Sequence, residues 1–162
     1  MNIFNKNLLY NLSGCQPHVL QASVVVACCV DLSIFGFEKY KDNLEKRVGM
    51  TQEKLQYFLN SKALNPALLG QEAVKQRGLE EVTYAMAYMT LAANEKGLET
   101  CIIGGIGNEY TQTAQDIYAV TRMELELPKD VALAALMLIG YPAEDNVVPH
   151  KERKSFDEIV SF

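Results

Sequence analysis

The stretch KGLETCIIGGIGNE, from Lys96 to Glu109, passes directly from a strand-like apolar run into glycines. The run is Cys101–Ile103, and Gly104 and Gly105 follow it at once. Two interpretations of this glycine pair are open. Either the backbone makes a turn that only glycine adopts, or a bulky ligand lies against bare backbone at the end of the strand.

Known nucleotide motifs do not explain these glycines. A dinucleotide-binding G-x-G-x-x-G pattern would use Gly105 and Gly107 and would need a third glycine at Tyr110. A P-loop lysine motif, a G-x-S-x-G nucleophile, an H-E-x-x-H zinc motif and a paired-carboxylate signature are also missing from the sequence. The motifs therefore identify no catalytic side chain and no metal site.

A long helical segment precedes the glycine stretch. It runs from Pro66 to Gly97, with weak points at Gly70 and Gly78. From Val82 onward it is apolar on nearly all sides, so we expect it to be buried in a core or at a large subunit interface. Gly97 suits the position that follows a helix end, where the backbone takes a left-handed conformation.

Two further apolar runs predict strands. The run ASVVVACCVDL (residues 22–32) is continuous and rich in β-branched residues, so we expect a strand buried on both faces, because a half-exposed strand would alternate. The run VALAALMLIGY (residues 131–141) predicts a second buried strand that ends at Gly140.

Helical spacing accounts for the remaining segments. It predicts surface helices in residues 37–48 and 51–64, and a helix in residues 111–125 capped by Thr111 or Thr113. The order is then strand, helices, strand, helix, strand and an irregular tail, without an internal repeat. This order indicates one α+β or α/β domain over residues 1–162, built in layers.

Composition narrows the class of protein. The formal net charge of −5 argues against a nucleic-acid-binding surface. No apolar run is long enough to cross a membrane, and the amino terminus has no secretory signal, so we expect a cytoplasmic protein. Cys15, Cys28, Cys29 and Cys101 form no C-x-x-C pair, which favours structural thiols over metal ligands.

The segment HKERK, residues 150–154, is the nearest approach to a basic cluster. Lys151 and Arg153 are two residues apart, so on an extended chain both side chains would point to the same side and could reach one anion. A lysine with an arginine suits a phosphate, because arginine offers a fixed fork of donors and lysine a mobile charge. The alternative is a solvated charged tail.

Three segments together resemble the flavin-dependent nitroreductase family. They are QPHVLQASVVVACCVD, LAANEKGLETCIIGGIG and LPKDVALAALMLIGYPAEDNVVPHKERKSFDEIV. Members of that family share an order of segments. A buried strand comes first, then a long helix ending in Ala-x-x-x-Gly-Leu, then a strand ending in Gly-Gly or Glu-Gly. A strand ending in Leu-Gly-Tyr follows, before a Lys-x-Arg tail. The resemblance implies an α+β layered fold, with a central sheet flanked by helices and a long buried helix at the interface of a homodimer.

The resemblance also implies a cofactor site. Ile102, Gly104 and Gly105 would contact the ring system of FMN through their backbone, and Lys151 with Arg153 would hold its phosphate. FMN would take a hydride from NAD(P)H and pass electrons to a nitroaromatic, a quinone or a similar small acceptor. No side-chain acid or base is required, so we expect no catalytic residue.

The chain departs from the family at its amino terminus. The usual Arg-x-Ser-x-Arg-like phosphate segment and the later Asn/Ser-x-Gln-Pro-Trp segment are missing from the sequence. A truncated product, a natural short paralogue and a fragment completed by another chain are the three explanations. Two other functions stay open: a non-catalytic homologue that dimerises or binds without flavin, and a thiol-based protein that uses Cys28 and Cys29.

Overall fold

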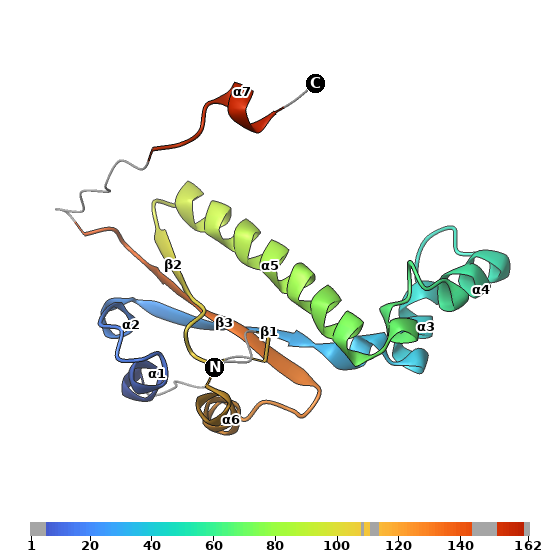
Figure 1. Cartoon of the computed structure of the whole chain (residues 1–162), viewed down its shortest axis with the longest axis horizontal. Helices are drawn as coiled ribbons and strands as arrows, with labels where there is room; N and C mark the ends of the chain where they lie inside the picture. The colour runs from blue at the N-terminus through green and yellow to red at the C-terminus, as the bar shows by residue number, and fades with distance from the viewer. Residues whose placement is uncertain (1–5, 108, 111–113, 144–151, 161–162) are drawn as a thin grey trace.

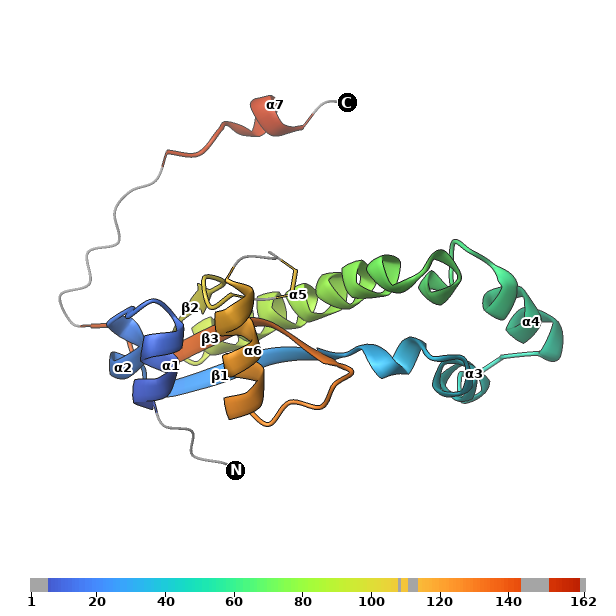
Figure 2. The ribbon, with the colours of Figure 1, turned by 60° about the horizontal axis from the view of Figure 1, so that its bottom comes forward.

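The computed structural model describes residues 6–107, 109–110, 114–143 and 152–160. Within these ranges the chain forms a small sheet with helices on both faces (Figures 1 and 2). The α-helices are α1 (Lys6–Leu12), α2 (His18–Gln21), α3 (Phe37–Glu45), α4 (Gln52–Asn60), α5 (Gln71–Glu95), α6 (Gln115–Glu124) and α7 (Phe156–Ile159). Two 3₁₀ helices are η1 (Leu32–Phe35) and η2 (Pro66–Leu69).

The sheet contains three antiparallel strands in the described ranges: β1 (Val24–Asp31), β2 (Glu99–Ile103) and β3 (Val131–Gly140). Their order in space is β1-β3-β2, so the last strand in the chain lies in the middle. The sequence of strand, helices, strand, helix, strand and tail expected from the residue pattern is confirmed.

The central strand carries one residue more than β1 in the middle of their ladder. Cys28 pairs with Ala135. The next residue, Cys29, pairs with Leu133, so the register of the ladder shifts by one residue at Ala134. Such a β-bulge shifts the alternation of side chains by one residue.

Because of the bulge, β3 presents small side chains on one face of the sheet and large side chains on the other. The face toward α5 is lined mainly by small side chains: Ala132, Ala134, Ala135 and Met137. The opposite face, toward α1, α2 and α6, is lined by leucines: Leu133, Leu136 and Leu138. The long helix can therefore lie close to the sheet, while large side chains fill the core on the other face.

Helix α5 crosses the small-residue face of the sheet (Figure 1). A Cβ atom at Gly78 would lie 2.8 Å from Leu32 Cδ2 and 3.1 Å from Val30 Cγ2, so the missing side chain lets the helix approach β1. The helix ends as expected. Gly97 has a φ of 72°, and the Leu98 amide donates to the Ala93 carbonyl in a Schellman motif.

Helices α3 and α4 lie beyond the end of the sheet and have a small core of their own, formed by Leu44, Leu55 and Leu59 (Figure 2). The predicted helix start at Thr51 is confirmed, because its hydroxyl accepts from the Lys54 amide. Helix α7 lies apart from the sheet in both views. None of the helices in the described ranges is long and apolar enough to cross a membrane.

Strand β1 is less buried than the sequence predicts. Cys28 and Val30 are buried, but Val24 is 47% exposed and the other residues are partly or fully exposed. The prediction of burial on both faces was wrong, because β1 is an edge strand that α5 and α1–α2 cover over only part of its length. The predicted caps Thr111 and Thr113 lie outside the described residues.

The two adjacent cysteines of β1 face opposite sides of the sheet, as expected for neighbours in a strand. Cys28 packs in the cluster under α5, and Cys29 packs against the leucine cluster on the other face. Burial raises the pKa of both thiols, that of Cys29 to about 11. This placement gives no support to a thiol-based function for the pair.

The leucine face of β3 provides the first test. Leu136 is fully buried, so Leu136→Ala should lower the free energy of unfolding by about 2–5 kcal/mol through lost burial and the cavity left behind. Met123→Ala, on an exposed position of α6, should change it by less than about 0.5 kcal/mol. Urea unfolding measures both, and equal effects would contradict the assigned core.

The reactivity of the four thiols provides a second test of the fold. Cys15 and Cys101 are exposed, so a thiol reagent at about pH 8 should label them in the folded protein. Cys28 and Cys29 should react only after denaturation, because burial keeps them as thiols at that pH. Mass spectrometry of labelled peptides locates the sites. Rapid labelling of Cys29 before unfolding would show that β1 is packed differently.

Candidate functional site

The glycine stretch begins where β2 ends, at the edge of the sheet. Ile103 is buried in the leucine cluster, whereas Ile102 is 49% exposed on the opposite face of the strand. Gly104 and Gly105 follow and are both exposed. The structure thus brings three of the five predicted site residues, Ile102, Gly104 and Gly105, to one accessible strand end.

The backbone of this strand end does not itself require two glycines. Gly107 has a left-handed φ of 60°, but Gly104 and Gly105 have no positive φ. Among the described residues, no atom lies within 4 Å of a Cβ built on Gly104, and one built on Gly105 meets only Gln16 Nε2 at 3.8 Å. In the part of the chain that the structure describes, neither a left-handed backbone nor close packing therefore accounts for the missing side chains at Gly104 and Gly105.

Arg153, one of the two predicted phosphate residues, is not brought to this strand end. Arg153 is exposed and lies on the segment before α7, which Figures 1 and 2 show apart from the sheet. Lys151 lies outside the described residues. The structure accordingly leaves the pairing of these two cations a prediction.

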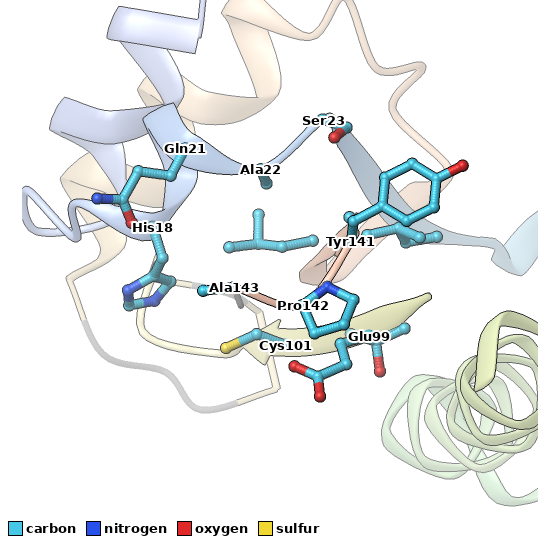
Figure 3. A pocket seen from close by; sticks show the side chains of 13 residues that line it. His18, Gln21, Ala22, Ser23, Glu99, Cys101, Tyr141, Pro142 and Ala143 are labelled. Atoms are coloured by element: carbon cyan, nitrogen blue, oxygen red, sulfur yellow. The ribbon is translucent and has the colours of Figure 1, made fainter. Parts of the chain in front are cut away.

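A cavity of about 560 Å³ lies on the other face of β2 (Figure 3). Cys101 points into it from β2, with His18 across from it on α2 and Tyr141 at the end of β3. Its volume lies within the range of small-molecule sites. Of the four predicted site residues that the structure describes, none lines it, and Ile102 lies on the other face of β2 because neighbours in a strand alternate.

A polar network follows the glycines and was not predicted from the sequence. Glu109 Oε1 lies 2.6 Å from Lys75 Nζ on α5, and Glu109 Oε2 accepts from Tyr118 Oη on α6 at 3.1 Å. Arg122 Nη1 in turn donates to Tyr118 Oη at 3.2 Å. The sequence gives no signal for this network, because Lys75 lies 34 residues before Glu109 and no motif links the four residues.

The protonation states of the network suit these contacts. Burial raises the pKa of Tyr118, so its hydroxyl keeps the proton that it donates to Glu109. The hydrogen bond to Glu109 raises the pKa of Lys75, so the ion pair persists at neutral pH. The Arg122 guanidinium also lies over the Tyr118 ring, 5.7 Å from its centroid, in a cation–π contact.

Comparison with known proteins identifies the fold. No protein-family model matches the chain, and a search of curated protein sequences gives no match. A Bacillus subtilis protein assigned as a nitroreductase superposes with a TM-score of 0.74 at 14% identity, over 97% of this chain and 72% of that one. A nitroreductase-like protein from Streptococcus mutans gives a TM-score of 0.73 at 17% identity, over 98% and 73% of the two chains.

A third solved structure is that of a Staphylococcus epidermidis protein assigned as an NAD(P)H:FMN oxidoreductase. It gives a TM-score of 0.68 at 17% identity, over 97% of this chain and 70% of that one. The resemblance drawn from the sequence is therefore confirmed at the level of architecture. The chain has the α+β nitroreductase fold.

Proposed function

We propose that the protein is an FMN-dependent oxidoreductase that transfers electrons from NAD(P)H to a nitroaromatic, a quinone or a similar small acceptor. When bound, FMN supplies the hydride chemistry, so the chain itself has to bind and orient the cofactor. The fold and the names of its structural neighbours support an oxidoreductase role. The acceptor class comes from the family resemblance.

One observation carries this proposal: within the described residues, neither a left-handed backbone nor a close neighbour requires glycine at positions 104 and 105. Their backbone takes no positive φ, and the described residues leave the space around them open. Exposed backbone next to a half-exposed Ile102 suits a flat ring that packs closely on a strand end. We assign the FMN ring to this strand end, and we assign the phosphate to Lys151 and Arg153 by resemblance.

We also propose that the protein is a homodimer and that the outer face of α5 forms its interface. Tyr84, Tyr88 and Leu91 are 66%, 72% and 64% exposed, and they follow one another at helical spacing. The inner face of the same helix is buried on the sheet through Val82 and Met86. An apolar stripe of this kind favours burial against a second copy.

Flavin binding tests the function. The purified chain should carry a flavin absorption band or bind added FMN, and riboflavin, which lacks the phosphate, should bind more weakly. Gly104→Val should weaken FMN binding by at least about tenfold, because a branched side chain would stand where the ring approaches. Its unfolding midpoint should stay unchanged, since the described residues leave room for it. Fluorescence titration and urea unfolding measure the two effects.

Gly36→Val is a control for location, because Gly36 lies before α3, away from the strand end, although a Cβ there would lie 3.1 Å from the Ser33 carbonyl oxygen. It should leave FMN affinity unchanged. A wild-type chain that binds no FMN at high micromolar concentration would contradict the proposal. The non-catalytic homologue would then be the better description, and NAD(P)H oxidation would not be expected.

The dimer has a separate test. Tyr88→Asp should shift the protein from dimer to monomer, because a carboxylate would be buried in the interface without a partner. Light scattering after gel filtration measures the mass. Tyr57→Asp, at an exposed tyrosine on α4, should leave the mass unchanged. A wild-type monomer would contradict the assignment.

A further inference from the structure

Glu109 lies two residues after Gly107, and its carboxylate contacts two helices. Its two carboxylate oxygens contact different helices: Oε1 contacts Lys75 on α5 at 2.6 Å, and Oε2 contacts Tyr118 on α6 at 3.1 Å. The two helices lie on opposite faces of the sheet. The carboxylate therefore ties the chain that leaves β2 to both helical layers at once.

The Lys75–Glu109 pair differs from the other ion pairs of the described residues. Its side chains are 28% and 25% exposed, whereas those of the other three pairs are 39–60% exposed. The pair also bridges residues far apart in the chain, while Lys41–Glu45 and Arg77–Glu80 lie within single helices. A less exposed pair is less screened by water and salt, so it can fix a position.

The network is anchored to the central strand through Arg122. Its guanidinium donates to the carbonyl of Val131, at the start of β3, and to that of Pro128 at 2.5 Å. The same side chain supports Tyr118, which donates to Glu109. The position of Glu109 is thereby set relative to the sheet as well as to the helices.

The glycine stretch has one anchor in its middle, because Ile106 is fully buried in the leucine cluster, and Glu109 provides a second anchor beyond Gly107. Three of the four residues from 104 to 107 are glycines, so in the unfolded chain this backbone has more conformational freedom than residues with side chains would give it. Ordering this backbone on cofactor binding would cost conformational entropy and weaken the binding free energy. The cost is avoided where the protein holds the backbone in place beforehand. Glu109 lies two residues beyond Gly107, close enough to limit its freedom.

From this geometry we propose that Glu109 and Lys75 are positioning residues, which hold the backbone of residues 104–107 in the arrangement that receives FMN. This inference rests on the proposed function. Neither side chain takes part in electron transfer. Their contribution is to keep the strand end ordered before the cofactor arrives, so their loss should weaken binding without unfolding the protein.

Two measurements on the full chain test this role. Lys75→Met should raise the amide exchange rate of residues 104–107 in the flavin-free protein, while exchange in β3 stays unchanged. It should also weaken FMN affinity by about tenfold, the scale expected for loss of one charge-assisted contact. Lys75→Arg, which keeps the charge, should restore both values. Arg77→Met, two residues away in an exposed pair, should affect neither.

The outcomes separate this proposal from the proposed function. A wild-type chain without FMN affinity contradicts the function, whatever the exchange rates show. A wild-type chain that binds FMN, with Lys75→Met and Glu109→Gln binding it equally well, overturns the positioning role alone. A matching loss of unfolding free energy and of exchange protection in β3 would also overturn it, because the pair would then act on the whole fold.

Discussion

The structure depends on the burial of one strand. β3 is hydrogen-bonded on both sides, to β1 and to β2, and every residue from Ala132 to Leu138 is buried. Its β-bulge at Ala134 places alanines under α5 and leucines toward α1, α2 and α6. Without that extra residue, the alternation would direct leucines toward the helix on one half of the strand, and α5 could not lie as close.

The same strand determines where the glycine stretch lies. Among the described strands, the short β2 pairs with β3 alone, so the chain leaves the sheet at Ile103 between the two helical layers. Gly104 and Gly105 follow at that edge, and Glu109 then reaches both α5 and α6. The position of the candidate site thus follows from the strand order. The edge strand β2 ends beside the central strand β3, and Lys75 on α5 and Tyr118 on α6 contact the segment that follows β2.

Local patterns in the sequence predicted much of this fold. The apolar runs gave the strands, helical spacing gave α3 to α6, and Gly97 marked the end of α5. The bulge at Ala134 could not be predicted, because a run that is apolar throughout does not show a one-residue shift of its faces. The Lys75–Glu109 pair was missed for a different reason: it joins residues whose proximity only the tertiary fold creates.

The most informative feature of the candidate site is a pair of glycines that neither packing nor backbone conformation explains within the described residues. At Gly78 the cause is visible, because a side chain would collide with Val30 and Leu32. At Gly97 and Gly107 it is the left-handed backbone. Within the described residues neither cause is present at Gly104 or Gly105, although a strand end would gain packing and lose less backbone entropy with larger residues. When a local rule is broken and nothing within the described chain compensates, the reason is best sought in what the chain binds.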